Sequence, residues 1–251
     1  MGLNRKTICL LALLALMGYA WAHGEAEEHA EEDRMEPSEY LPVDPWPLAL
    51  YAGAFILLVS FVAFISRNLT TDAHKKMFFI LIAVPTVLVT LYMAATTVYL
   101  NLASTSGGPV HWHADYEIWA CGEKVEHLED AGLLSNTVGS PVLHHHEDNR
   151  IHVEGLVVNK EDIALAKFFK VIGGGLTDSA ITLPLEGGAV KTYRNGDLCP
   201  DGKPGTLRLY VKEHQTGQFF ESTEIAGYVI KPGFEVPPGD YLKIAFETEG
   251  N

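Results

Sequence analysis

Two long apolar runs without a charged residue constrain the fold of this chain more than any other feature. They extend over residues 48–65 and 77–102. Because a helix rises about 1.5 Å per residue, runs of this length cross a hydrocarbon core of about 30 Å. The sequence therefore predicts two transmembrane helices, over residues 47–66 and 77–102.

The charges beside these runs predict their orientation. The connector, residues 67–76, carries three basic residues against the single Asp72, whereas the segment before the first helix, residues 23–46, is strongly acidic. The positive-inside rule then places the connector in the cytoplasm. We expect the protein in the cytoplasmic membrane, with the acidic tail and residues 103–251 facing the periplasm or the cell exterior.

The N-terminus is typical of an export signal, which requires the same orientation. Basic residues precede an apolar run from Ile8 to Ala20, and the small residue Ala22 marks a cleavage point. Residues 1–22 are therefore predicted to be a signal peptide. Eight acidic residues lie between His23 and Glu39. Such a stretch cannot bury enough apolar surface to fold, so we expect a solvated tail.

The composition of the chain also limits its partners. Neither apolar run carries an ionisable side chain, so the residue types of a proton relay or ion pathway are missing and the runs are interpreted as an anchor. A formal net charge of −14 without a basic stripe disfavours a nucleic-acid partner. The predicted partners are the lipid bilayer and, through the threonines of the second run, a membrane protein complex.

Residues 103–251 are long enough for one domain, and their patterns predict a mostly antiparallel β-sheet with one main helix. The expected helix is capped by Asn159 and ends at Gly173. Strands are expected over Val110–Ala120, Ile151–Val158 and Leu207–Val211, with a closing strand around Leu242, Ile244 and Phe246. The predicted fold class is thus a membrane-anchored α+β protein.

Seven of the eleven histidines fall between His111 and His152. Side chains two residues apart on a strand share a face, so His111 and His113 point the same way. The apolar neighbours of His152 face the core of their strand, which turns His152 and Glu154 together to the opposite face. Two strands would then each present a polar pair that can converge on one ion.

The run His144–His146, followed by Glu147 and Asp148, is predicted to be a loop that completes this cluster. Imidazole and carboxylate donors together suit Zn(II), Cu(II) or Fe(II), and the extracytoplasmic location favours copper or zinc. The predicted ligands are His111, His113, His144, His146, His152 and Glu154. The alternatives are hydrogen-bonded structural histidines, with Glu154 holding His152 in one tautomer.

Cys121 and Cys199 lie in the same predicted extracytoplasmic domain. An oxidising compartment lets such a pair form a disulfide where the geometry permits. The alternative is a thiolate metal ligand, which fits Cys121 better because it follows the strand that carries the first histidine pair.

The segments HWHADYEIWACGEKV, HHHEDNRIHVEG and LAKFFKVIG resemble an exported prokaryotic domain family with a His-Trp-His-Ala strand, a histidine-containing loop and an Ile-His-x-Glu strand. The likeness covers residues 111–173 and, more loosely, the closing strand; the third consecutive histidine and the two apolar runs depart from the pattern. The resemblance implies a set of positions and not an activity: His111, His113, His146, His152 and Glu154.

A weaker pattern, His111-x-His113-x-x-x-Glu117, is similar to the first metal motif of cupins, but no histidine follows the Pro238-Gly239 turn. The predicted function is an anchored metal-binding protein, acting in metal handling or as an accessory subunit of a membrane metalloenzyme. One alternative is a cupin-like metal-dependent enzyme with Glu147 or Glu154 as base. The other is a structural subunit whose histidines bind no metal.

Overall fold

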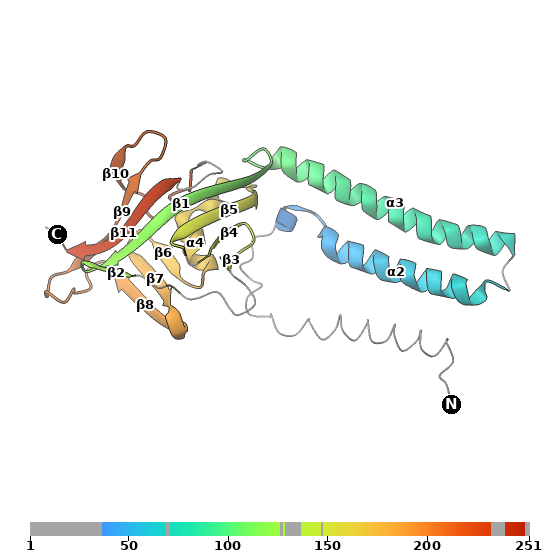
Figure 1. Cartoon of the computed structure of the whole chain (residues 1–251), viewed down its shortest axis with the longest axis horizontal. Helices are drawn as coiled ribbons and strands as arrows, with labels where there is room; N and C mark the ends of the chain where they lie inside the picture. Colours follow the sequence, from blue (N-terminus) through green and yellow to red (C-terminus); the bar gives the residue numbers. More distant parts are fainter. Residues whose placement is uncertain are drawn as a thin grey trace, which may run out of the picture. The chain divides into compact units, whose positions relative to one another are not determined.

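A computed structural model of the protein describes residues 37–68, 71–125, 128, 137–146, 148–231 and 239–248. The predicted signal peptide, residues 23–36 of the predicted tail, and Glu147 lie outside these described residues. After the short 3-10 helix η2 (Pro37–Tyr40), the described chain consists of two long helices followed by a strand-rich domain (Figure 1).

The two long helices are α2 (Pro45–Ser66) and α3 (Asp72–Ala103), which lie side by side (Figure 1). Both are long and apolar enough to cross a membrane. The N-cap Asp44 accepts a hydrogen bond from the backbone N–H of Trp46, which fixes the start of α2. Helix α3 begins before the predicted span, so Lys75 lies in its first turn and pairs with Asp72 at 2.9 Å.

A main sheet of eight strands forms the strand-rich domain, in the order β10-β9-β11-β1-β5-β4-β3 with β2 paired to β1. Every pairing is antiparallel except that of β1 with β11. The predicted mostly antiparallel α+β domain is thereby confirmed. The strands are β1 (Pro109–Ala120), β2 (Glu123–Val125), β3 (Val138–Gly139), β4 (Leu143–His145), β5 (Arg150–Leu156), β9 (Gly205–Lys212), β10 (Phe219–Ser222) and β11 (Asp240–Thr248).

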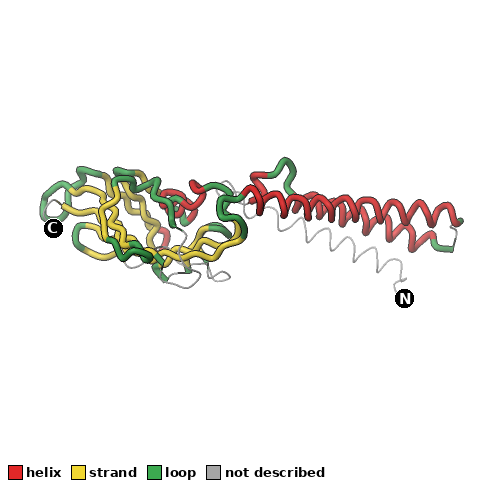
Figure 2. The backbone as a smooth tube through the Cα atoms, turned by 90° about the horizontal axis from the view of Figure 1, so that it is seen from above, coloured by secondary structure: helices red, strands yellow, loops and turns green. Residues whose placement is uncertain are grey.

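A second layer packs on the core face of this sheet. It contains the 3-10 helix η3 (Lys160–Ile163), α4 (Leu165–Val171) and a three-stranded sheet, β6 (Gly175–Thr177), β7 (Ala180–Leu185) and β8 (Ala189–Arg194), with η4 (Glu186–Gly188) between the last two. Figure 2 distinguishes these short helical segments from the continuous helices α2 and α3. Burial of Leu165, Phe168 and Phe169 on α4 anchors the layer in the core.

The prediction of a single helix from Asn159 to Gly173 is wrong, because Ala164 interrupts the helix. Ala164 is extended, with φ −70° and ψ 151°, and forms a β-bridge with Val229. The backbone N–H of Leu165 then donates to the carbonyl of Tyr228. Pairing with this distant segment therefore replaces one turn of the helix. Local helix propensity cannot predict such a pairing.

The alternation in β1 separates its two faces as predicted. Ala114, Tyr116 and Ile118 are buried in the core, where the Tyr116 ring lies 5.5 Å from that of Phe168. The residues between them point to the opposite face of the sheet. The side chains of His111 and Glu117 are accordingly both on the open face of β1.

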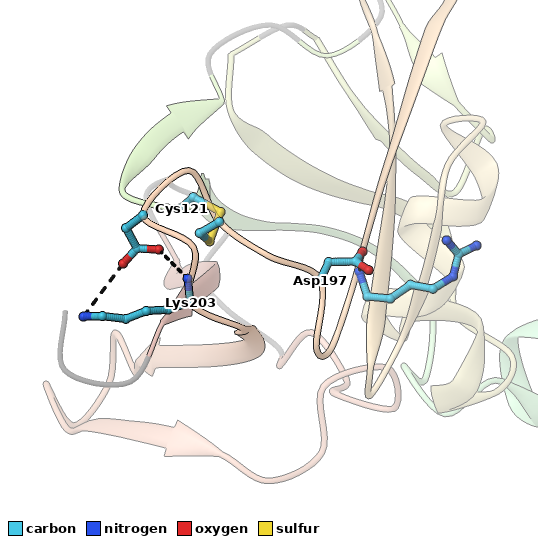
Figure 3. Close-up of a disulfide and its surroundings, with 6 residues drawn as sticks. Cys121, Asp197 and Lys203 are labelled. Atoms are coloured by element: carbon cyan, nitrogen blue, oxygen red, sulfur yellow. Dashed lines mark hydrogen bonds and ion pairs between the residues drawn. A yellow bond between two sulfur atoms is a disulfide. The ribbon is translucent and has the colours of Figure 1, made fainter.

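A disulfide joins Cys121 and Cys199, at the end of β1 and in the connection between β8 and β9 (Figure 3). The two residues are 78 positions apart in the sequence. A cross-link that closes a loop of this size stabilises a fold by about 4 kcal/mol in the chain-entropy account. With both sulfur atoms bonded to each other, neither cysteine is a thiolate ligand for the histidine cluster.

Candidate metal centre

Strand register brings three histidines into one row across the open face of the sheet. His113 on β1 is directly opposite His152 on β5, and His152 is directly opposite His144 on β4. Directly opposite residues share a face, with Cβ atoms about 4.5–5.5 Å apart. In the same register His111 lies opposite Glu154.

The first two histidines of the run lie in a strand where the sequence predicted a loop. Residues Leu143–His145 form β4, and Leu143 is completely buried beside Val153 of β5. This apolar contact turns His144 to the open face and His145 to the core, where its ring lies 6.0 Å from that of Phe168. His144 and His145 therefore have different environments.

A tight turn before β4 sets this register. Gly139 has φ +125°, and a Cβ atom there would lie 2.6 Å from the carbonyl oxygen of Leu143. The Ser140 hydroxyl accepts a hydrogen bond from the backbone N–H of Leu143 at 3.0 Å. The Gly139-Ser140-Pro141 sequence is a turn signal that could have indicated the strand after it.

The ring of His152 is central to the cluster. Its centroid lies 4.8 Å from the ring of His113 and 4.6 Å from that of His146, and it stacks on His144 at 5.5 Å. The rings of His111 and His113 are 4.6 Å apart. All five imidazoles therefore surround one small region of the open face.

Two overlapping groups of these side chains offer ligand atoms to a metal ion. In each group the ligand atoms all lie within 4.8 Å of one another. In tetrahedral coordination, zinc–nitrogen bonds of about 2.0–2.1 Å place two ligand atoms about 3.4 Å apart, so the most distant atoms of either group must approach each other by roughly 1 Å or more to bind one ion. The groups are His144, His146, His152 and Glu154, and His111, His113 and His152.

The Glu154 carboxylate contacts members of both groups. Its Oε1 atom lies 2.9 Å from Nε2 of His111 and 4.0 Å from Nε2 of His144. Glu154 therefore places a carboxylate between the two groups.

Two further residues orient the buried imidazoles. Nδ1 of His144 is 3.2 Å from the carbonyl oxygen of Ser140, and Nε2 of His152 is 3.2 Å from Oδ2 of Asp148. Since both oxygens only accept hydrogen bonds, these ring nitrogens carry the protons. The lone pairs are then on Nε2 of His144 and Nδ1 of His152, and such outer contacts are usual for metal-binding histidines.

The Nδ1 atom of His152 is buried and has no hydrogen-bond partner among the described residues. A buried polar atom without a partner is costly and rare in native folds. The structural-histidine alternative leaves this atom unexplained. A metal ion accepts its lone pair, so the donor set and the unpartnered nitrogen both fit a bound metal.

Burial sets the protonation states that metal binding requires. Desolvation lowers the pKa of both His144 and His152 below the ordinary value of 6.5, against the opposing effect of nearby carboxylates. Burial acts to raise the pKa of Asp148, but the hydrogen bond and charge of His152 outweigh it and the pKa is lowered. Near pH 7 His144 and His152 are therefore neutral, the state that a metal ion binds, and Asp148 is an anion.

Glu117, the last residue of the cupin-like pattern, does not join the cluster. Its carboxylate accepts hydrogen bonds from Lys124, Trp119 and Tyr241 at 2.9, 3.0 and 2.7 Å. These contacts, that of Lys124 first, lower the pKa of Glu117 to about 2. Within the described residues the sheet is also an open path from β10 to β3 and not a barrel.

Comparison of the chain with family models, with curated proteins and with solved structures gives no match. The chemistry of the cluster must therefore be inferred from its own geometry. Ser140, which the sequence pattern did not indicate, and Asp148, which was predicted in the loop but not among the ligands, orient the rings of His144 and His152.

Proposed function

We propose that this protein is a membrane-anchored, outward-facing metal-binding protein that handles copper(II) or zinc(II), alone or as an accessory subunit of a membrane metalloenzyme. The observation that carries the proposal is the buried Nδ1 of His152, which has no hydrogen-bond partner among the described residues and lies in a row of imidazoles across three strands.

Exposed apolar side chains on both long helices support the membrane anchor. Leu57 and Phe64 on α2 and Leu91 on α3 are each more than half exposed in the isolated chain. An apolar surface of this extent requires a cover, and a lipid bilayer supplies it along the whole length of both helices. The charges of the connector support a cytoplasmic location for it.

The connection to the anchor keeps the cluster near the membrane. His111 follows Ala103, the last residue of α3, by eight positions. At no more than about 3.5 Å per residue, the two Cα atoms are within about 28 Å in any arrangement of helix and domain. A metal bound here is thus within reach of a partner in the same membrane.

The donor set supports copper or zinc over softer or harder ions. Neutral imidazoles with one carboxylate are borderline ligands, which suit Zn(II) and Cu(II), and to a lesser degree Fe(II). We place metal binding ahead of catalysis, because the contacts at the cluster concern its donor atoms; the cavity of about 410 Å³ beside Trp112, Tyr228 and Lys231 is not lined by any of the proposed ligands.

Metal analysis of the full-length protein in detergent tests the proposal. After dialysis against micromolar zinc or copper, we expect about one or more ions per chain, and less than about one tenth of that in His152→Ala. The control His214→Ala, at an exposed turn after β9, should match the wild type. Equal metal content in His152→Ala and the wild type, or none in either, would refute it.

A further inference from the structure

We propose that the cavity beside Trp112 binds an anionic phospholipid, taking up its phosphate headgroup and the adjoining part of its acyl chains. This inference goes beyond the metal centre and rests only on the membrane anchor of the proposed function. The cavity has a volume of about 410 Å³, within the range of about 300–1,000 Å³ that small-molecule sites occupy.

The cavity lies on the face of β1 opposite to the metal cluster. Trp112, which lines the cavity, is between His111 and His113 in the strand, and successive side chains of a strand point to opposite faces. The six proposed metal ligands are not among the lining residues. A molecule bound in the cavity therefore has no contact with the metal ligands.

Two connections hold the cavity close to the ends of both long helices. Thr105, a lining residue, is two positions after Ala103, the last residue of α3, so their Cα atoms are within about 7 Å. The Thr105 backbone N–H donates to the carbonyl of Val158 at 3.2 Å. Tyr40, which precedes α2, donates from its hydroxyl to Asp162 of η3 at 2.8 Å, and η3 also lines the cavity.

This end of α3 corresponds to the depth of the lipid headgroups. The uncharged run of α3 ends at Leu102, and the headgroups extend a bilayer from about 30 Å of hydrocarbon to about 40–45 Å. Tyr99 near this end is 55% exposed, and tyrosine is enriched where hydrocarbon meets the headgroups. A cavity whose wall includes Thr105 is therefore within reach of phospholipid headgroups.

The inner wall of the cavity is apolar. Val157, Ile163 and Ile230 line it and are at most 2% exposed. The backbone N–H of Ile230 donates to the carbonyl of Ile163 at 3.1 Å, so the two segments that carry these residues lie side by side. Such a wall suits the part of an acyl chain next to the headgroup, because contact with it removes CH₂ groups from water.

Two lysines among the lining residues supply positive charge. Lys160 is exposed, and the side chain of Lys231 is 49% exposed and forms an ion pair with Glu213. Against these two cations the lining contains one acidic residue, Glu224. Lysine binds phosphate as a point charge, and basic residues at a membrane surface attract anionic lipids. An anionic phospholipid therefore matches both the charged and the apolar part of the lining.

Quenching of Trp112 fluorescence by brominated lipids tests this proposal. The full-length protein is reconstituted in vesicles of phosphatidylcholine and phosphatidylglycerol in equal amounts, with bromine on the acyl chains of only one of the two lipids. The signal of Trp112 is the difference between the wild type and Trp112→Phe, which subtracts the other tryptophans. We expect brominated phosphatidylglycerol to quench Trp112 at least about threefold more than brominated phosphatidylcholine.

Lysine variants test the source of this preference. Lys160→Gln should reduce it, and Lys160→Gln combined with Lys231→Gln should abolish it. The matched control Lys191→Gln, exposed on β8 and not a lining residue, should keep it. The zinc content of all these variants should equal that of the wild type, because the cavity and the cluster are on opposite faces of β1.

Equal quenching by the two labelled lipids, or a preference that the folded double lysine variant keeps, overturns the proposal and leaves the metal centre intact. Far-ultraviolet circular dichroism verifies folding. A preference that glycerol 3-phosphate abolishes by competition would indicate a site for a soluble phosphate ester, and this result also overturns the proposal. Wild-type protein that does not float with the vesicles refutes the membrane anchor itself.

Discussion

The two ends of the open face of the main sheet both carry polar side chains. They differ in the hydrogen-bond partners that these side chains have. At the β9-β10-β11 end each carboxylate has its own donor: Glu221 accepts from Arg208 at 2.7 Å, and Glu247 accepts from Tyr210. At the β4-β5-β1 end the imidazoles face one another, and Nδ1 of His152 has no partner among the described residues. Polar groups with partners stabilise a fold, whereas a buried nitrogen without a partner among the described residues is what a bound ligand would explain.

Strand β1 takes part in both ends. His113 and Glu117 are on the same face of β1, about 13 Å apart at 3.3 Å per residue. Their environments differ because β5 and β4 place histidines beside His113, whereas β2 and β11 place Lys124 and Tyr241 beside Glu117. The neighbouring strands, and not the residue pattern of β1, decide at which end the imidazoles gather.

The largest difference between the ends should follow from changing Asp148. Asp148→Asn removes the charge that orients His152, and we expect zinc affinity to fall about 10–100-fold. Glu221→Asn, at the other end, should leave the affinity within about twofold. Competition titration with a zinc-specific fluorescent chelator measures both; equal effects would mean that the ends do not differ in function.

Distortion of the turn before β4 should affect the histidine end alone. Gly139→Ala places a Cβ atom against the Leu143 carbonyl, and we expect a loss of about 2 kcal/mol of unfolding free energy together with weaker zinc binding. The matched control is Gly202→Ala, at φ +77° with nothing within 4 Å, which should cost about 1 kcal/mol and leave zinc affinity unchanged. Denaturant titration compares the unfolding free energies of the two variants, and competition titration with the chelator compares their zinc affinities. Equal zinc affinities would contradict the role assigned to the turn.

The pH dependence of stability in acid should test the contacts of Glu117. The folded-state pKa of Glu117, about 2, is below the ordinary 4.5, so its contribution is complete above pH 4.5 and is lost as the pH falls from 4.5 toward 2. Since the side chain is about a quarter exposed, we expect roughly 1 kcal/mol after solvent screening. Glu117→Gln should flatten this part of the stability profile, while Glu123→Gln on β2 should not. An unchanged profile would show that the contacts of Glu117 contribute nothing.

The smallest effect should be that of mild acid on the metal-free histidine end. His144 and His152 have folded-state pKa values below 6.5, so the unfolded chain binds protons more readily and stability falls as the pH drops through 6.5. The carboxylates of Asp148 and Glu154 oppose the shift and keep the loss small. Thermal unfolding with chelator between pH 7.5 and 5.5 measures it, and stability that rises over this interval would contradict the assigned burial effect.

The periodicity of the sequence is sufficient to predict an element whose buried and exposed faces follow from its own residues. The long helices follow from the two uncharged runs, and β1 and β5 follow from the alternation around His113 and His152. Their facing pairs of polar side chains were therefore predictable from the sequence alone. What the alternation cannot give is which strands are neighbours.

The rest of the site depends on contacts between distant segments. The three-residue strand β4 is too short to show a period, so its histidines are indistinguishable from a polar loop. The parallel pairing of β1 with β11 and the break at Ala164 depend on partners far along the chain. The roles of Ser140 and Asp148 likewise depend on where the strands bring them, and no local spacing encodes that.

X-ray absorption at the zinc edge of the loaded full-length protein is the most direct test of the central claim. We predict nitrogen and oxygen neighbours at about 2.0–2.2 Å, about four per ion, with the outer-shell scattering of imidazole rings, and loss of the imidazole signal in His152→Ala. A spectrum with oxygen neighbours alone, or one that His152→Ala leaves unchanged, would contradict a metal centre at the histidine end of the sheet.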